Sequence, residues 1–589
     1  MGKLTLGLLV TPVQINGGMI MRTRFLVSAG LAASLAGCSA LGGGEDGADL
    51  IIHGGPILTM EGDAPAYAEA VVVDEGKIVF VGGKAEAMQM KADGTEVKDL
   101  GGKLLMPGFI DPHSHFIDSL VLGDRINVSA PPAGPAKDAE AIIAELKRGA
   151  AAKGLKPGEL LLGYGYDENL MPGGKVLDRD MLDAAFPDNP VGIVHVSMHG
   201  AVMNSRAMEK FGYTDGMPTP EGGVILRKAD GKSLQGLVME TAYIPMITKL
   251  PIPTEADEVE AARKGQMIYA AAGVTTAQEG ATHIAPLAQL KRIAAKEGFF
   301  IDVVAYPFVT DLEAILKDNP PETFGSYNNR FKIGGCKITA DGSPQGRTAW
   351  FKTPYLQGGP AGEADYTGGP GIPPDLMKKW VQYCYDNDLQ VMVHANGDAA
   401  IDFMLELHRG AAGDDPAKDR RTVCIHCQFI RPDQLAEFAK LNLISALFTD
   451  HTFFFGDTHV ANRGIAQASF ISPMKAAMAA GLKPTNHTDA FVVPVSQMLT
   501  VWTAVNRPRR SGGTLGEDQR ITPYQALQAI TVNAAYQYRE EATKGSLAPG
   551  KLADMVILSA DPNAVDPMAI RDIEVIETIK EGRTIYRQP

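Results

Sequence analysis

Between about residues 106 and 543, short apolar runs alternate with longer amphipathic stretches. The apolar runs include residues 191–194, 390–393 and 423–425, and the amphipathic stretches include residues 255–272 and 374–387. Strands that alternate with helices are typical of a parallel sheet built from βα units. Because this segment exceeds about 400 residues, it predicts a (β/α)8 TIM barrel with insertions, an α/β fold. A doubly wound sheet is the alternative, disfavoured because no Gly-x-Gly-x-x-Gly motif opens a helix after the first strand.

The two ends of the chain contain shorter apolar runs separated by tight turns. Near the N-terminus, a pair of such runs flanks Asp74-Glu75-Gly76-Lys77, a hairpin signal. Residues 555–558 and 575–579 near the C-terminus are similar short apolar runs. The sequence therefore predicts one small composite β-sandwich domain, made from residues 49–105 and 544–589, beside the barrel of residues 106–543.

The N-terminus has the pattern of a secretory leader. Arg22 and Arg24 precede a short apolar stretch, which ends in Leu35-Ala36-Gly37-Cys38. This ending resembles a bacterial lipobox, which makes Cys38 the expected lipidated first residue of the mature protein. We therefore expect residues 1–38 to be a leader and residues 39–48 a tether, with the protein periplasmic and lipid-anchored. Residues 1–20 precede this unit, so translation is expected to start at Met19 or Met21; a chance apolar N-terminus on a cytosolic protein is the alternative.

The charge balance limits the classes of partner. The chain has 69 acidic and 55 basic residues and a formal net charge of -14. Nucleic acid is not an expected partner, because phosphate binding needs basic patches. No run of 18 or more apolar residues occurs in the body of the chain, so contact with a membrane is expected only through the N-terminal anchor. A small molecule is the expected partner, and the sequence does not decide whether the protein forms a homo-oligomer.

Four cysteines follow Cys38, and their spacing implies no disulfide framework. Cys424 and Cys427 bracket His426, a spacing also found in zinc knuckles and redox pairs. A second cysteine pair at knuckle spacing is absent from the sequence. Two small buried apolar residues beside a strand end are therefore the favoured interpretation.

Side chains that can bind metal ions follow several of the apolar runs. The residues concerned are His113, His115, Lys337, His394, His426 and Asp489. If His113 and His115 lie on a strand, their spacing of two residues places them on one face. The ends of barrel strands surround a common axis, so side chains from separate strand ends converge there. Imidazole and carboxylate groups in such a cluster are typical ligands of zinc and other divalent metals.

These motifs resemble those of a known family. The sequence from Pro107 to His115 resembles the first-strand signature of the amidohydrolase superfamily. Segments 163–168, 204–208, 337–343, 394–398, 451–457 and 545–554 resemble the YtcJ-like branch, to which N-substituted formamide deformylases belong. The resemblance covers residues 49–589, and its motifs occur in the same order.

The resemblance implies a site with two divalent metal ions, zinc by expectation. It assigns His113, His115 and Asp489 to the first metal and His394 and His426 to the second. Lys337 bridges both as a carbamate formed with CO2, since an unmodified ammonium cannot bind a cation. With Lys337 unmodified, a single metal is expected, and the sequence does not identify the element.

The implied reaction is hydrolysis of a non-peptide carbon–nitrogen bond, and the expected substrate is an N-substituted amide. Two metals acidify water so that hydroxide exists near neutral pH. Asp489 then acts as both ligand and proton shuttle to the leaving amine. The alternatives are a dipeptidase, lactonase or esterase with the same metals, and a lipoprotein that binds a ligand without turnover.

Fewer features of the sequence identify the residues that bind the substrate. His199 matches a position that the family places over the metals, and we expect it to contact substrate or transition state. The other expected substrate-binding residues are Asn204, Tyr166, His451, Phe454 and His487. Two of them depart from the family: His487-Thr488 stand where Gly-Ser is usual, and Tyr166 stands where Trp is frequent. For His487, a hydrogen bond to the metal site and a cap on the strand are the alternatives.

Overall fold

The computed structural model describes residues 47–131, 133–167, 171, 176–196, 200–220, 223–250, 254–359 and 363–589. The chain divides into two units, Met1–Glu45 and Asp46–Pro589, and the described residues belong to the second. The predicted leader with Cys38, most of the predicted tether, and His199 lie outside the described residues. Within the described segments of the chain, no helix combines the length and apolar character needed to cross a bilayer.

Two parallel sheets carry the predicted alternation of strands and helices. Their orders are β15-β14-β13-β6 and β16-β17-β18-β19-β20. The strands are β6 (Phe109–Ile110), β13 (Val274–Thr282), β14 (Asp302–Pro307), β15 (Phe331–Ile333), β16 (Gly335–Thr339), β17 (Gln390–Ala395), β18 (Val423–His426), β19 (Ile444–Leu447) and β20 (Thr485–Asn486). Every pairing inside these two sheets is parallel.

Contacts on both sides connect the two parallel sheets. Phe308, directly after β14, forms a parallel bridge with Lys337 in β16. On the other side, the backbone N–H of Asp489 donates to the carbonyl of His113 at 3.0 Å, so the segments after β20 and β6 adjoin. This mixed α/β arrangement is consistent with a TIM-barrel-type fold, as predicted.

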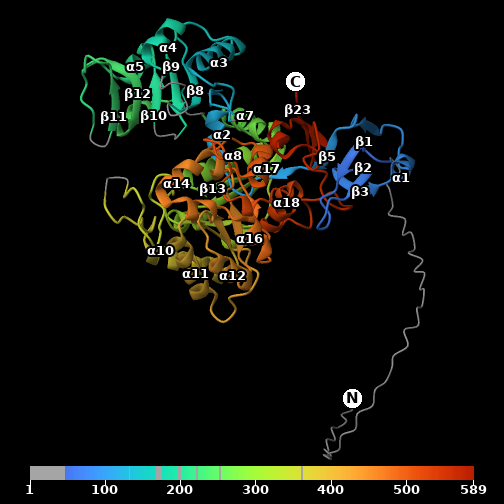
Figure 1. Cartoon of the computed structure of the whole chain (residues 1–589). Helices are drawn as coiled ribbons and strands as arrows, with labels where there is room; N and C mark the ends of the chain where they lie inside the picture. The colour runs from blue at the N-terminus through green and yellow to red at the C-terminus, as the bar shows by residue number, and fades with distance from the viewer. Residues whose placement is uncertain are drawn as a thin grey trace, which may run out of the picture. The chain divides into compact units, whose positions relative to one another are not determined.

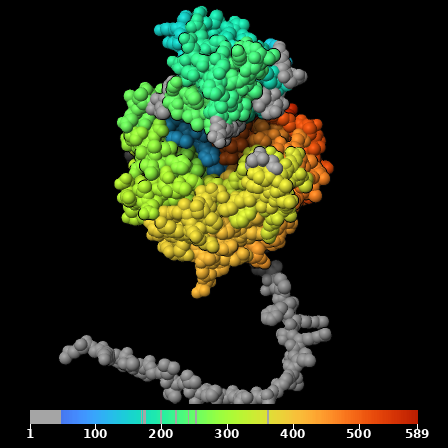
Figure 2. Space-filling view, turned by 90° about the vertical axis from the view of Figure 1, so that its left-hand side faces the viewer, coloured from blue at the N-terminus to red at the C-terminus, as the bar shows by residue number. Residues whose placement is uncertain are grey.

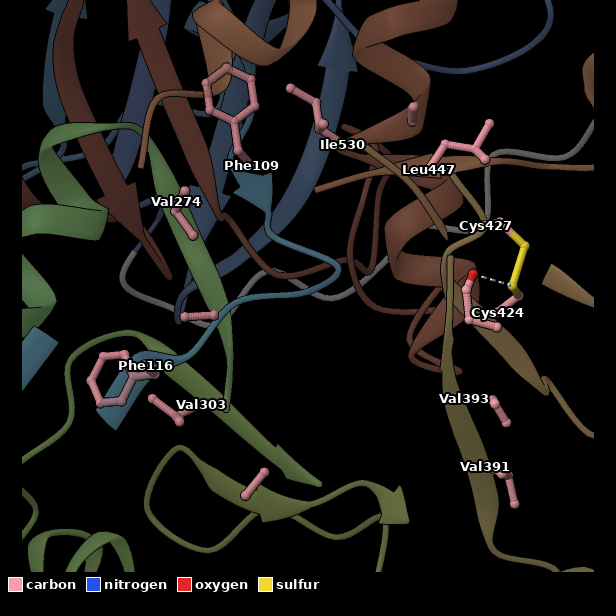
Figure 3. Packing of buried hydrophobic residues seen from close by; sticks show 14 of the residues in the cluster. Phe109, Phe116, Val274, Val303, Val391, Val393, Cys424, Cys427, Leu447 and Ile530 are labelled. Atoms are coloured by element: carbon pink, nitrogen blue, oxygen red, sulfur yellow. Dashed lines mark hydrogen bonds between the residues drawn. A yellow bond between two sulfur atoms is a disulfide. The ribbon is translucent and has the colours of Figure 1, made fainter. Parts of the chain in front are cut away.

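Helices lie between these strands (Figure 1). They are α2 (Phe116–Leu122), α7 (Glu258–Ala271), α8 (Ile284–Ala295), α9 (Leu312–Asp318), α10 (Pro374–Asp386), α11 (Asp398–Ala412), α12 (Pro432–Lys440), α13 (His451–Phe454), α14 (Gly456–Arg463), α15 (Ile465–Ser469), α16 (Met474–Ala479), α17 (Gln497–Asn506), α18 (Pro523–Ala529) and α19 (Val532–Gln537). The apolar faces of these helices pack on the strands, and Phe109, Val274, Val303, Val391 and Val393 belong to the shared core (Figure 3). Burial of each such Val or Phe side chain contributes roughly 1.5–3 kcal/mol to folding, so this core stabilises the strands.

Residues 126–240, inside the segment predicted as a barrel with insertions, contain a separate sheet. Its order is β11-β12-β10-β9-β8-β7. The strands are β7 (Ile126–Asn127), β8 (Leu161–Tyr166), β9 (Val191–His195), β10 (Gly200–Met203), β11 (Gly223–Arg227) and β12 (Leu234–Glu240), with helices α3 (Ala139–Ala152), α4 (Arg179–Ala185) and α5 (Ser205–Phe211), followed by α6 (Ile244–Ile247). The run 191–194, predicted as a barrel strand, is therefore β9 of this insert. An apolar run does not reveal which sheet it joins, and the insert has apolar cores of its own.

Both ends of the chain meet in one sheet, as predicted. The order is β23-β22-β21-β5-β1-β2-β3, and β4 pairs with β1. The strands are β1 (Leu50–Leu58), β2 (Tyr67–Asp74), β3 (Lys77–Gly82), β4 (Glu96–Asp99), β5 (Leu104–Pro107), β21 (Met555–Leu558), β22 (Val575–Lys580) and β23 (Arg583–Arg587), with α1 (Lys84–Gln89) beside them. The hydrogen bonds follow one continuous sheet of eight strands, whereas a sandwich was expected.

Asn204, expected to bind substrate, has a structural role in the insert. Its side-chain oxygen accepts hydrogen bonds from the backbone N–H of Ala207, which caps α5, and of Val191, which begins β9, both at 2.9 Å. Its amide nitrogen donates to the carbonyl of Asn189 at 2.8 Å. The side chain is fully buried. No donor or acceptor of Asn204 is therefore directed at a substrate.

We expect Asn204→Ala to lower the free energy of unfolding by about 3 kcal/mol. The variant loses a helix cap, worth about 1 kcal/mol, and leaves buried backbone groups unpaired at about 1–3 kcal/mol. Asp138→Ala is the matched control, because Asp138 caps α3 through Ala141 alone, and about 1 kcal/mol is expected. Urea unfolding measures both. Equal losses in the two variants would contradict this role of Asn204.

Candidate active site

The two histidines of the first motif lie in the turn after β6. That strand ends at Ile110, and His115 is the N-cap residue of α2, so the expected placement on one strand face is wrong. The turn is held by Asp111, whose carboxylate accepts from the backbone N–H of His113 at 3.3 Å and from the hydroxyl of Thr488 at 2.5 Å. The two imidazole rings nevertheless lie close, with centroids 5.2 Å apart.

Asp489 lies between these histidines. Its Oδ1 atom is 3.4 Å from Nε2 of His113 and 3.3 Å from Nε2 of His115. Ligand atoms of the three side chains all lie within 4.8 Å of one another, a spacing that could hold one metal ion. Burial alone would raise the pKa of Asp489, but His426, His115 and His113 hold it well below its usual range. The carboxylate is therefore ionised at neutral pH.

The remaining three predicted ligands approach the same group. His394 in β17 and His426 at the end of β18 have ring centroids 4.6 Å apart. Nε2 of His426 is 3.9 Å from Oδ2 of Asp489, and Nζ of Lys337 is 3.2 Å from Nε2 of His113. The structure thus brings all six side chains together from strand ends that are distant in the sequence.

The electrostatics of this cluster fit bound cations. Oδ1 of Asp489 is a buried carboxylate oxygen that accepts no hydrogen bond. Burial lowers the pKa of Lys337 to about 7, although the charge of Asp489 opposes the shift. Burial also lowers the pKa of His394 to about 4. His394 thus meets the requirement of a metal ion for a neutral imidazole. His115 differs: burial would lower its pKa, but the hydrogen bond and the charge of Asp489 raise it to about 9, so a bound ion must displace a proton from this imidazole.

His487 contacts the cluster through His426, in agreement with the alternative of a hydrogen bond to the metal site. It is fully buried, and its Nε2 atom is 2.9 Å from Nδ1 of His426. This hydrogen bond leaves Nε2 of His426 directed toward Asp489. A partner on one ring nitrogen orients a ligating histidine and selects its tautomer. The residues that replace the usual Gly-Ser thus serve the site, since Thr488 also binds Asp111.

Sequence reasoning missed Gln278, which orients His113. Oε1 of Gln278, in β13, is 2.5 Å from Nδ1 of His113. Its amide nitrogen donates to the carbonyl of Pro112 and to the hydroxyl of Tyr538, both at 2.8 Å. The sequence of β13 contains several other polar residues, so Gln278 does not stand out there, and only the structure shows that it is fully buried.

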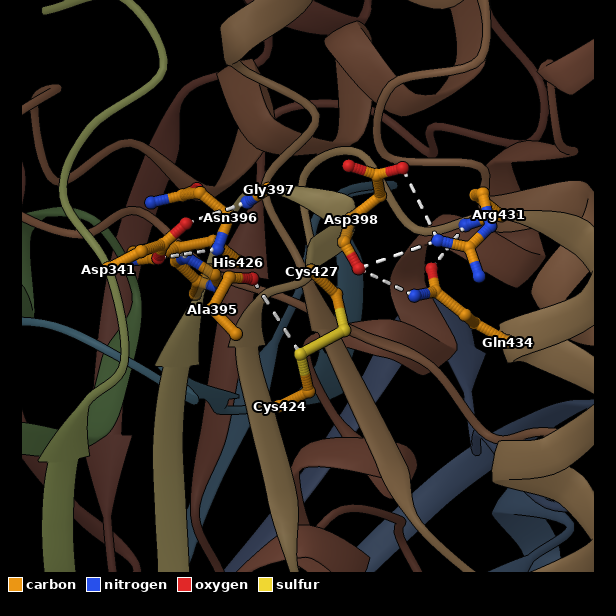
Figure 4. Close-up of a disulfide and its surroundings, with 11 residues drawn as sticks. Asp341, Ala395, Asn396, Gly397, Asp398, Cys424, His426, Cys427, Arg431 and Gln434 are labelled. Carbon is orange, nitrogen blue, oxygen red and sulfur yellow. Dashed lines mark hydrogen bonds and ion pairs between the residues drawn. A yellow bond between two sulfur atoms is a disulfide. The ribbon is translucent and has the colours of Figure 1, made fainter. Parts of the chain in front are cut away.

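Asp341 orders the loop after β16 through backbone N–H groups. Its carboxylate accepts from the backbone N–H of Trp350 at 2.9 Å. It also accepts from those of Asn396 and Gly397 at 2.9 and 2.8 Å (Figure 4). These bonds connect the end of β16 to the end of β17, where His394 lies. Asp341 therefore fixes the position of one predicted ligand from the neighbouring strand.

Cys424 and Cys427 form a disulfide, which corrects the interpretation as two separate apolar residues (Figure 4). The bond closes a short loop around His426, the last residue of β18. His426 and Cys427 have φ values of 71° and 44°, a left-handed conformation that costs non-glycine residues roughly 1–2 kcal/mol each. The crosslink holds this strained turn and, with it, the imidazole of His426.

A cavity of about 1000 Å³ opens beside His115. Its lining includes Tyr164 and His195 from the insert, and Phe454 and Arg510 from the segments after β19 and β20. Figure 2 shows the surface hollowed between the cyan-to-green insert and the yellow-to-orange residues. The cavity is large enough for a small-molecule substrate.

Two expected substrate contacts do not line this cavity. Tyr166 is buried in the apolar core of the insert, because β8 has an irregular register between Tyr164 and Tyr166, at Gly165 with a φ of 94°, and this turns the two rings to different sides. His451 is buried beside His459, with Nδ1 3.0 Å from Nε2 of that residue. Phe454 does line the cavity, and its contact with substrate stays a prediction.

Comparison with known proteins places these features in one family. The sequence profile of the amidohydrolase family matches residues 96–586. The protein YtcJ of Bacillus subtilis (strain 168) is 28% identical over 556 residues, covering 91% of this chain and 99% of its own length. The N-substituted formamide deformylase of Arthrobacter pascens is 24% identical, covering 92% and 98%. A crystal structure of an uncharacterized metal-dependent hydrolase from Pyrococcus horikoshii OT3 matches with a TM-score of 0.66 and 24% identity, covering 88% of this chain and 99% of that one.

Proposed function

Because the chain belongs to the amidohydrolase family, we propose that it is a metal-dependent hydrolase of a non-peptide carbon–nitrogen bond, an N-substituted amide in particular. The observation that carries this proposal is the convergence of His113, His115 and Asp489 with the histidines of β17 and β18. Of these side chains, His115 lines the cavity, so a small molecule bound there lies beside the cluster.

The proposed ligand set has two halves. His113, His115 and Asp489 would hold one divalent ion, and His394 and His426 would hold a second. Zinc is the expected metal. Lys337 would bridge them as a carbamate. In support, a pKa of about 7 leaves much of this amine neutral at neutral pH, and the neutral form is the one that reacts with CO2.

The residues of the chain supply proton transfer and orientation. When bound, the divalent ions supply Lewis acidity, which lowers the pKa of water and polarises a carbonyl. Asp489 accepts a proton from water at a carboxylate oxygen and passes it to the nitrogen of the leaving amine. Gln278 and His487 hold the imidazoles of His113 and His426 in the required orientation.

An N-substituted amide is the favoured substrate because a relative that spans almost the whole chain carries the name N-substituted formamide deformylase. A dipeptidase, a lactonase or an esterase would use the same side chains.

The decisive experiment measures bound metal and screens metal-loaded protein against N-acyl amines, dipeptides, lactones and cyclic ureides. Hydrolysis of an N-acyl amine supports the proposal. A protein that retains no metal and binds such an amide without turnover would favour a ligand-binding lipoprotein.

We further propose that the protein is periplasmic and anchored by a lipid on Cys38. The support is the leader pattern, in which basic residues and an apolar stretch precede Leu35-Ala36-Gly37-Cys38. Cys38→Ser is expected to move the protein from the membrane fraction to the soluble fraction, as followed by immunoblotting after cell fractionation. Cys336→Ser is the matched control, because Cys336 is buried in the core. Unchanged fractionation of Cys38→Ser would reject the anchor.

A further inference from the structure

Arg510 is a basic side chain of the substrate cavity that the proposed chemistry does not use. It follows α17 and lines the same cavity as His115. Its guanidinium carbon lies 5.1 Å from the ring centroid of Phe453 and 5.2 Å from that of Phe454. The two aromatic rings thus hold the guanidinium in place, since such cation–π contacts stabilise a fixed orientation.

The donors of Arg510 are available, in contrast to those of its neighbours. Arg507 donates to the carbonyls of Leu515 and Ile471, both at 2.7 Å. Arg509 interacts with Asp457 at 3.4 Å. Among the residues that the structure describes, Arg510 donates no hydrogen bond and forms no ion pair. A guanidinium offers five N–H groups in a planar fork, so Arg510 presents an unused bidentate donor to the cavity.

The electrostatic surroundings of Arg510 favour an added anion. Burial lowers the pKa of its guanidinium, and the charge of Asp167, which also lines the cavity, partly opposes this. A partly desolvated cation whose donors are unused is unfavourable, and a ligand that supplies a carboxylate removes that penalty. Asp118, beside His115, is the other acid of the lining.

We propose that Arg510 binds a carboxylate of the substrate, so that the preferred substrates are N-acylated amino-acid-like amides with an apolar or aromatic side chain. The inference rests on the proposed function. Phe454 and Phe455 line the cavity beside Arg510 and provide the apolar contact. The scissile carbonyl then lies toward His115, at the metal end of the same cavity.

The test compares two amides that differ only in the carboxylate, N-formylphenylalanine and N-formylphenethylamine. Metal-loaded wild-type protein is expected to show a kcat/KM for the acid about 10- to 100-fold higher, the range that a charge-assisted hydrogen bond produces. Arg510→Met is expected to bring this ratio close to one, mainly through KM. Arg510→Lys keeps the charge without the planar fork and is expected to fall between the two. Arg509→Lys is the matched control and should keep the wild-type ratio.

Calorimetric binding of N-formylphenylalanine separates this inference from the proposed function. If wild-type protein hydrolyses neither amide, binding that is lost in Arg510→Met still supports the carboxylate site, while the hydrolase proposal fails. Hydrolysis of both amides with equal kcat/KM would overturn the carboxylate site and leave the hydrolase intact. A preference for the acid that persists in Arg510→Met would overturn it as well, and so would equal binding by both proteins when neither amide is hydrolysed.

Discussion

Asp489→Asn is expected to lower kcat by at least about 100-fold on any amide that the wild-type protein hydrolyses, with the fold intact. Asparagine has nearly the same shape but cannot take up a proton at this position, and general acid–base catalysis contributes about 10²–10⁴-fold. The variant also removes the negative charge that His113, His115 and His426 surround. We therefore expect bound metal to fall as well.

Steady-state kinetics, elemental analysis of bound metal and thermal unfolding together test this prediction. Asp311→Asn is a suitable control, because Asp311 also follows a parallel strand but pairs with the exposed His283 at 2.9 Å. A kcat close to wild type in Asp489→Asn would exclude the proposed proton transfer. Metal retained at the wild-type level with turnover lost would restrict the role of Asp489 to the proton.

Lys337→Ala is expected to reduce bound metal to one equivalent or fewer and to remove most activity. The side chain is almost fully buried, so its loss leaves space beside His113. Short carboxylic acids such as acetate or propionate should partly restore both metal and turnover, because their oxygens can replace those of a carbamate. Lys337→Met fills the same space and should not be rescued.

Lys332→Met is the matched control for this experiment. Lys332 is another buried lysine, in β15, and its ammonium pairs with Glu540. Breaking a buried ion pair costs about 3–5 kcal/mol, so this variant should lose stability but keep its metal. Two metals retained in Lys337→Ala, without rescue by acids, would exclude the carbamate.

The alternation of strands and helices predicted from the sequence is present along most of the chain. It could be recognised because a buried parallel strand and an amphipathic helix each have a characteristic pattern of apolar residues that is visible in the sequence alone. The bounds of the insert could not be recognised in the same way. The run at 191–194 has the composition of a barrel strand, and only its pairing with β8 and β10 identifies its sheet.

The roles of supporting residues depended on contacts that the sequence does not reveal. His487 is 61 residues from its partner His426, and Gln278 is 165 residues from His113. Asn204 was taken for a substrate contact because it belongs to a motif, yet its bonds hold α5 and β9 together. Tyr164 and Tyr166 are two residues apart and would share one face of a regular strand, but the irregular register of β8 at Gly165 separates them, so that Tyr164 alone of the two lines the cavity.

The sequence by itself determined the membership in the amidohydrolase family and the identity of six candidate ligands. It could do so because most of these residues lie in or after apolar runs, because parallel strand ends meet around a common axis, and because the motifs around them resemble those of the family. Only the tertiary structure decided which side chains orient those ligands, which cysteines pair and which residues line the cavity. These properties depend on distances between segments that are far apart in the chain. Asp489 shows both contributions, since its sequence position marks it as a ligand and its three histidine neighbours set its charge.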